Sequence, residues 1–306
     1  MRLLFCYLLL SLLPTYTVLH AQKVSEQLKY LGQEPPGLIP EVFAPGLISK
    51  NDASEFGSVF NKDATTFFYA VDNNGKAEIR YSALRGNKWS SPQTLFAHEA
   101  YGFNDPFLSP DEKRLYFISQ KASEGAGAKR DYDIWYVEKQ HDSWSEPINA
   151  GPNINSGKDE YYISFTREGT MYFSSNKNTP KKERSSFDIY SSKNINGQFQ
   201  PAVQLGPSVN TSNYEADVFV APDESYLIFC ARRPEGLGRG DLYISYKNID
   251  GTWTKAINMG NKINTAKHEL CPFVSMDGKY FFYTSNQDIY WVSTKIITEL
   301  KEKIKD

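Results

Sequence analysis

Four glutamates stand at equivalent places in a repeated segment and are the first candidates for chemistry. They are Glu55, Glu160, Glu215 and Glu269. In the remaining copy Phe103 takes this position, and Asp105 follows it by two residues, as Asp217 follows the third glutamate. Carboxylates gathered at one place can bind a divalent cation, hydrogen-bond a sugar, or hold one carboxyl protonated by like-charge repulsion. A pair of them can also supply the acid and base of a glycosidase.

Further candidate ligand-binding residues lie beside these carboxylates. His268 directly precedes Glu269 and is a candidate base or metal ligand, although a lone histidine is more often a surface or packing residue. Long basic segments occupy residues 121–131, 176–186 and 232–240. Arginine side chains there can form bidentate contacts with a carboxylate or phosphate, and the alternative is that these loops are simply solvated. The arginines in question are Arg130, Arg232, Arg233 and Arg239.

The glutamates belong to a unit that the sequence repeats five times. Each copy predicts a short strand, a polar turn, a second strand rich in Tyr and Phe, and a third strand opened by an acidic residue. In four copies a fourth strand with Trp or Phe follows. The copies begin at residues 55, 103, 160, 215 and 269, which gives spacings of 48, 57, 55 and 54. This period fits one four-stranded propeller blade per copy.

The last copy lacks its fourth strand, because the chain ends soon after residue 293. Residues 40–49 resemble residues 147–156, which include the fourth strand of the second copy. The N-terminal segment is therefore expected to complete the last blade, and closure of the ring removes exposed strand edges. The sequence thus predicts an all-β, five-bladed β-propeller. The first strand of each blade lines the channel, so the glutamates would meet at one mouth beside the long loops.

The chain ends predict a processed, exported protein. Residues 1–21 combine a positive start, an apolar run and a small residue at the cut, which is typical of a secretory signal peptide; the rival interpretation is an uncleaved anchor. Residues 22–39 form an N-terminal extension, residues 40–293 the propeller and residues 294–306 a short helix. We expect that helix to pack on its own domain, with docking of a partner as the alternative.

Composition narrows the possible functions. Lys and Arg number 34 against 36 Asp and Glu, so the net charge of −2 argues against a general nucleic-acid binder. After the signal peptide, no segment is apolar enough to cross a bilayer. Two cysteines then remain, Cys230 and Cys271, which we interpret first as buried free thiols and second as a disulfide.

Several recurring motifs resemble a known repeat family. They are the Pro–Asp turns at 110–112 and 222–224, the DIY motif at 188–190 and the WSxP motif at 89–92. Together they resemble the exported TolB-type, WD-like "Pro-Asp" repeats of Gram-negative bacteria, over residues 40–293. A five-repeat set is also similar to the propellers within envelope proteins of Bacteroidota. The chain departs from TolB in having five repeats rather than six and no separate N-terminal α/β domain. The resemblance implies a fold rather than one activity, because propellers serve many functions.

These observations favour a binding protein over an enzyme. We expect an exported, periplasmic or extracellular monomer that binds a protein or glycan partner at the cell envelope. We expect no cofactor, unless a divalent cation binds at the channel mouth. The alternative is a glycosidase-like enzyme that uses Glu160, Glu215 and Glu269. Residues that recur in every unit are more often part of blade architecture, and an acid and a base need different environments, so we favour a structural role for these glutamates. A scaffold that docks through its C-terminal helix is the third interpretation.

Overall fold

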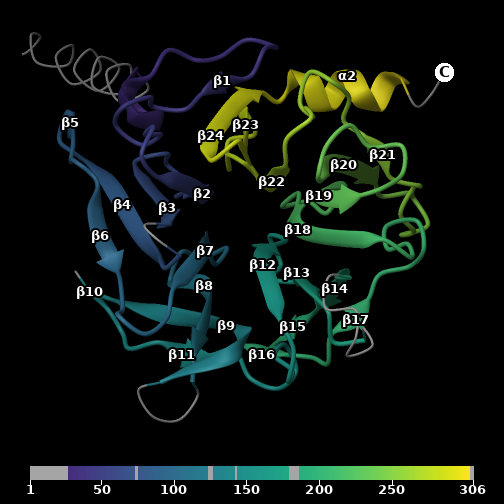
Figure 1. Ribbon diagram of the computed structural model, residues 1–306, viewed down its shortest axis with the longest axis horizontal. Helices are drawn as coiled ribbons and strands as arrows, with labels where there is room; N and C mark the ends of the chain where they lie inside the picture. Colours follow the sequence, from purple (N-terminus) through teal and green to yellow (C-terminus); the bar gives the residue numbers. More distant parts are fainter. Residues whose placement is uncertain (1–26, 73–74, 123–126, 142, 179–185, 304–306) are drawn as a thin grey trace, which may run out of the picture.

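Five antiparallel sheets surround a common axis in the computed structural model (Figure 1). The structure describes residues 27–72, 75–122, 127–141, 143–178 and 186–303, and within these it leaves out the side chains of residues 128–130. The predicted signal peptide lies outside the described residues. The predicted all-β, five-bladed propeller is confirmed, with one blade for each sequence repeat.

Every blade starts with its inner strand at the axis and adds strands outward. Blade 1 contains β2 (Ser54–Phe60), β3 (Thr66–Asp72), β4 (Ala77–Arg85), β5 (Lys88–Trp89) and β6 (Gln93–Phe96). Blade 2 contains β7 (Phe103–Leu108), β8 (Arg114–Lys121), β9 (Ala128–Gln140), β10 (Ser143–Trp144) and β11 (Ile148–Asn149). Blade 3 contains β12 (Glu160–Phe165), β13 (Met171–Ser175), β14 (Asp188–Ser192) and β17 (Val203–Gln204).

The remaining elements complete the ring. A small hairpin, β15 (Asn194–Ile195) and β16 (Gln198–Phe199), lies between β14 and β17 in the chain. Blade 4 contains β18 (Tyr214–Val220), β19 (Tyr226–Arg232), β20 (Asp241–Tyr246) and β21 (Ile257–Asn258). Blade 5 contains β22 (Glu269–Val274), β23 (Tyr280–Ser285), β24 (Asp288–Ser293) and the N-terminal β1 (Glu41–Val42). The helical elements are η1 (Tyr30–Gly32) and α2 (Lys295–Lys303).

The N-terminal strand closes the ring as the sequence predicts. In Figure 1 the purple β1 lies beside the yellow β24, and the two pair in antiparallel fashion with Val42 opposite Tyr290. The next residue, Phe43, is fully buried, and its N–H donates to the Ile289 carbonyl at 2.7 Å. Its ring packs 5.1 Å from Trp291 of blade 5 and 5.2 Å from Phe67 of blade 1. The closing segment therefore joins the first and last blades through the core.

Each inner strand carries a β-bulge near its start, and the same backbone conformation recurs there in all five blades. The third residue of each repeat, two positions after its start, has a positive φ of 46–59°, in the left-handed region. We call these residues the bulge ring: Gly57, Asp105, Tyr162, Asp217 and Cys271. Strand pairing shifts register beside each of them. The regular alternation of a strand predicts that the third residue of a repeat points the same way as the first. The bulge interrupts this alternation, so the prediction does not hold here.

The bulge ring fills the middle of the channel. The Tyr162 hydroxyl of blade 3 donates to the Pro272 carbonyl of blade 5 at 2.9 Å, and Cys271 Sγ lies 3.5 Å from Asp105 Oδ1 of blade 2. A Cβ added at Gly57 would lie 2.7 Å from that carboxylate oxygen, so only glycine fits. The two mouths of the channel are therefore separate recesses.

The C-terminal helix packs on the propeller. Ile296 and Ile297 of α2 are buried, and the Tyr246 hydroxyl of blade 4 donates to the Ile297 carbonyl at 3.0 Å. Within the described residues, no helix has the length and apolar character needed to span a membrane. Cys230 and Cys271 are buried free thiols.

Candidate functional site

The repeated glutamates are buried and accept hydrogen bonds from the loops that enter their blades. Glu160 accepts the N–H and hydroxyl of Ser156 at 3.0 and 2.6 Å, and the Ser175 hydroxyl at 2.7 Å. Glu269 repeats this pattern with Thr265, at 3.1 and 2.7 Å, and with a serine hydroxyl of β23. Each carboxylate thus fastens the chain between two blades. We call this loop–glutamate arrangement the clasp.

An asparagine completes the clasp. The Asn155 amide accepts from the Ile134 N–H and donates to the Ile134 carbonyl, both at 2.9 Å, so it acts as one more strand residue at the blade edge. Asn210 and Asn264 do the same in the next two blades. At the ring closure Ser49 replaces the asparagine and makes a single bond of 3.3 Å to the Ile289 N–H.

The closing clasp is also weaker at its glutamate. There Lys50 occupies the place of the serine or threonine, and only its N–H reaches Glu55, at 3.3 Å. Burial raises the pKa of Glu55 to about 7. Burial also raises the pKa of Glu160 to about 7, although the hydrogen bonds from Ser156 and Ser175 act in the opposite direction. These carboxyls are therefore partly protonated at neutral pH.

One of the predicted anion-binding arginines is already paired. Arg233 Nη2 lies 3.3 Å from Glu215 Oε1, and the two side chains are only 5% and 0% exposed. The same guanidinium donates to the Val209 carbonyl at 2.9 Å. A buried charge needs such partners, since desolvation costs several kcal/mol per ion. Arg233 therefore serves the clasp of blade 4.

The structure brings other predicted residues together at the mouth where the inner strands start. A recess of about 230 Å³ opens there, which we call the tyrosine mouth. It collects residues from all five blades. Among those that line it are Asp105, Asp217, His268, Tyr132, Tyr161 and Tyr214. None of the four clasp glutamates is among its described lining residues, and ligand binding by them stays a prediction.

Two carboxyls of the bulge ring form the floor of the tyrosine mouth. Burial raises the pKa of Asp105 to about 7. Burial and the neighbouring Asp105 raise the pKa of Asp217 to about 8. No ammonium or guanidinium group in the described part of the chain forms an ion pair with either. At neutral pH Asp217 is therefore mostly protonated and Asp105 partly so, and a protonated carboxyl can both donate and accept hydrogen bonds.

Basic residues surround this floor without contacting it. Burial, with smaller contributions from Arg232 and Arg239, lowers the pKa of His268 to about 4, so its imidazole is neutral at pH 7. Its Nε2 lies 3.5 Å from Cys230 Sγ. The exposed Arg232 lies over the Tyr214 ring, 4.7 Å from its centroid, and Arg239 is exposed at the rim. Arg130 lies in β9, and its side chain is outside the described residues.

The tyrosines were not singled out from the sequence. The ring centroid of Tyr132 lies 5.2 Å from that of Tyr161. The Tyr161 ring stacks on Phe187 at 4.9 Å, and Phe187 lies 5.8 Å from Tyr214. All three tyrosines are half-buried and form an aromatic arc across blades 2 to 4. The available signal was that each tyrosine adjoins an acidic residue that opens a strand.

The donor set at this mouth is sparse for a metal. Within the described chain, no three His, Cys, Asp or Glu side chains form a group suited to a metal ion. A cation at the tyrosine mouth would depend on Asp105 and Asp217, and it would have to displace their protons.

The fold is similar to that of other solved structures. No family model and no curated protein matches the sequence. Among solved structures, TolB from Acinetobacter baumannii matches with a TM-score of 0.50 and 14% identity, over 78% of this chain and 54% of that chain. The chain has a TolB-like propeller fold. It spans about half the length of that TolB. A protein of unknown function from Dyadobacter fermentans matches with a TM-score of 0.52 and 12% identity, over 81% and 78% of the two chains. Identities this low support the fold and no specific activity.

Proposed function

We propose that this protein is an exported, non-catalytic propeller that binds a protein or glycan partner at the cell envelope through the tyrosine mouth. The observation that carries the proposal is the aromatic arc of Tyr132, Tyr161 and Tyr214, which lines one recess together with the buried carboxyls of Asp105 and Asp217. Tyrosine offers a large apolar surface together with a hydroxyl, which suits recognition of peptides and sugars alike. The carboxyls of Asp105 and Asp217 add donors and acceptors at the floor.

The clasp supports binding over hydrolysis. A glycosidase needs one carboxyl held protonated as the acid and another held ionised as nucleophile or base. Glu160, Glu215 and Glu269 are buried and hydrogen-bonded within their own clasps. Burial raises the pKa of both Asp105 and Asp217, and no described cation forms an ion pair with either, so neither carboxyl is held ionised as a nucleophile or base requires.

Export is proposed on two grounds. The N-terminal sequence is typical of a secretory signal peptide, and the repeats resemble those of exported TolB-type propellers. The helix α2 buries its isoleucines against the propeller, which favours the tyrosine mouth over this helix as the docking surface. Amino-terminal sequencing of the protein from cell fractions tests the export; a start at Gln22 is expected, and an unprocessed start at Met1 would contradict it.

The binding proposal is tested with matched tyrosine variants. Tyr161→Ala removes the centre of the aromatic arc, and Tyr81→Ala removes a half-buried tyrosine on an outer strand of blade 1. The melting temperature of each is measured with peptidoglycan fragments and with acidic and neutral oligosaccharides, and retention of envelope proteins is compared on immobilised variants. We expect a ligand-dependent rise or a retained protein that Tyr161→Ala loses and Tyr81→Ala keeps. Equal behaviour of both variants would refute the proposed surface.

A further inference from the structure

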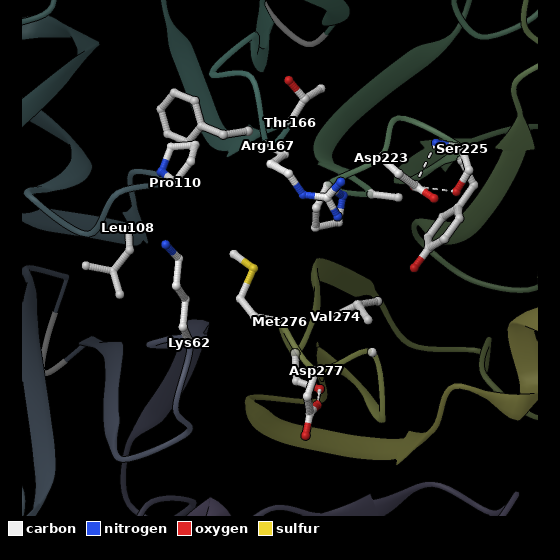
Figure 2. A pocket seen from close by; sticks show the side chains of 16 residues that line it. Lys62, Leu108, Pro110, Thr166, Arg167, Asp223, Ser225, Val274, Met276 and Asp277 are labelled. Carbon is white, nitrogen blue, oxygen red and sulfur yellow. Dashed lines mark hydrogen bonds between the residues drawn. The ribbon is translucent and has the colours of Figure 1, made fainter.

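The opposite mouth of the channel forms a second recess with different chemistry. A cavity of about 620 Å³ opens where the hairpin turns join each inner strand to the second strand (Figure 2). One residue from each turn lines it, at the same position in every repeat. We call this set the turn ring: Lys62, Pro110, Arg167, Pro222 and Met276. The ring thus contains two cations, three uncharged residues and no acid.

In most repeats an acidic residue directly follows the turn-ring residue and shapes the turn, whereas the turn-ring residue itself differs between repeats. Asp223 accepts the N–H and hydroxyl of Ser225, at 3.1 and 2.6 Å. Asp277 accepts the Ser275 hydroxyl at 2.8 Å and the Tyr30 hydroxyl at 2.7 Å. These acids of the mouth are therefore engaged by their own turns and by the N-terminal segment, and they keep their negative charge: despite burial, hydrogen bonds lower the pKa of both carboxyls, and the charge of Arg167 adds to this effect at Asp223.

The two cations are not engaged in this way. Lys62 and Arg167 are exposed, and neither forms an ion pair with another described residue. Their backbones are held: the Lys62 N–H donates to the Glu112 carboxylate, and the Arg167 N–H donates to the Pro222 carbonyl at 2.7 Å. In Figure 2 both side chains extend into the same opening from blades 1 and 3. Two anchored turns thus present two unpaired positive charges to one recess.

Apolar side chains line the space between these cations. Leu108, Phe165 and Val274, at the ends of three inner strands, contribute to the wall, and Met276 projects into the opening. A ligand that matches this arrangement carries negative charge on either side of an apolar group. An extended peptide with Glu, an apolar residue and Glu at every second position has this form, since alternate side chains of an extended chain point to the same face.

We propose that the turn mouth binds an acidic peptide segment of a partner protein, with carboxylates on Lys62 and Arg167 and an apolar side chain between them. This site is independent of the tyrosine mouth, because the bulge ring fills the channel between the two. A propeller with two such faces can hold two partners at once.

The test uses a fluorescein-labelled peptide with the sequence Glu-Ser-Leu-Ser-Glu, which places leucine between two glutamates on one face of an extended chain, and a control peptide with glutamines in place of the glutamates. Binding to the whole protein is followed by fluorescence anisotropy at low and at high salt. We expect the acidic peptide to bind about tenfold more tightly than the control peptide, and higher salt to weaken the complex. The double variant Lys62→Ala/Arg167→Ala should weaken binding by about tenfold, as two exposed charge contacts suggest. Its melting temperature should stay unchanged.

One further variant and a vesicle experiment decide between outcomes. Tyr161→Ala at the opposite mouth should bind the acidic peptide as the wild type does, whatever the fate of the proposed function. Equal binding of the glutamine peptide, or unchanged affinity in the double variant, would overturn the proposal. Binding of phosphatidylglycerol vesicles in place of the peptide, lost in the double variant, would also overturn it by assigning the recess to a lipid surface.

Discussion

Removal of one hydroxyl from a clasp should destabilise the whole propeller. In the variant Thr265→Val the side chain keeps its shape but loses the 2.7 Å hydrogen bond to Glu269 Oε1. A hydrogen bond to a charged group contributes about 1.5–3 kcal/mol. Glu269 keeps two donors, the Thr265 N–H and the Ser285 hydroxyl, so we expect the lower part of this range, about 2 kcal/mol. For a domain of this size that corresponds to a melting temperature lower by about 4 °C.

A matched control distinguishes loss of the clasp hydrogen bond from the general effect of replacing a threonine that donates to a carboxylate. Thr252 donates the same kind of bond, at 2.6 Å, to the carboxylate of Asp250, but on an exposed turn. Thr252→Val should therefore leave the unfolding transition unchanged within error. Urea unfolding followed by tryptophan fluorescence compares the two, and an unchanged m-value shows that stability itself has moved. If Thr265→Val costs no more than Thr252→Val, the clasp does not hold the blades together.

Three more changes follow from the same contacts. Lys50→Thr gives Glu55 the hydroxyl donor that the other clasps have, and should raise stability by about 1 kcal/mol in urea unfolding; a lower midpoint would contradict this. Gly57→Ala places a Cβ against Asp105 at a positive φ, and should cost about 2 kcal/mol or more by the same assay; a neutral change would contradict the close approach. Asp105 and Asp217 bind protons more tightly when folded, so stability should fall as pH rises from about 4 to about 8. Asp217→Asn should flatten that fall in melting scans, and an unaltered slope would refute the assignment.

The repeat made the fold predictable. Five copies of one unit, with a spare fourth strand at the N-terminus, leave little choice but a closed ring, and β1 pairs with β24 accordingly. The structural role of the clasp glutamates could also be predicted, because they recur in the repeats and a recurring residue is commonly part of the blade architecture. Their partners were not identified, since the serine or threonine donors lie in loops whose conformation the strand pattern does not define.

The channel interior could not be predicted from strand periodicity. A left-handed residue stands at the same place in every inner strand, yet the five positions hold four different residue types: Gly57, Asp105, Tyr162, Asp217 and Cys271. Only Gly and Asp are common in that conformation, so Tyr and Cys gave no signal for it. The bulge turned Asp105 and Asp217 into the recess and left Glu215 in its clasp. The partner of Arg233 could not be predicted for a similar reason. Glu215 lies 18 residues away in the sequence, and the two side chains meet only because of the register between β18 and β19.

The central claim is that a partner binds at the tyrosine mouth, and site-specific photocross-linking in the cell tests it most directly. A photoreactive amino acid replaces Tyr161 in one strain and Tyr81 in another, and both strains are irradiated. The account predicts a discrete covalent adduct with an envelope component from position 161 and none from position 81. Irradiation that gives no adduct at 161, or the same adduct at both positions, would contradict it.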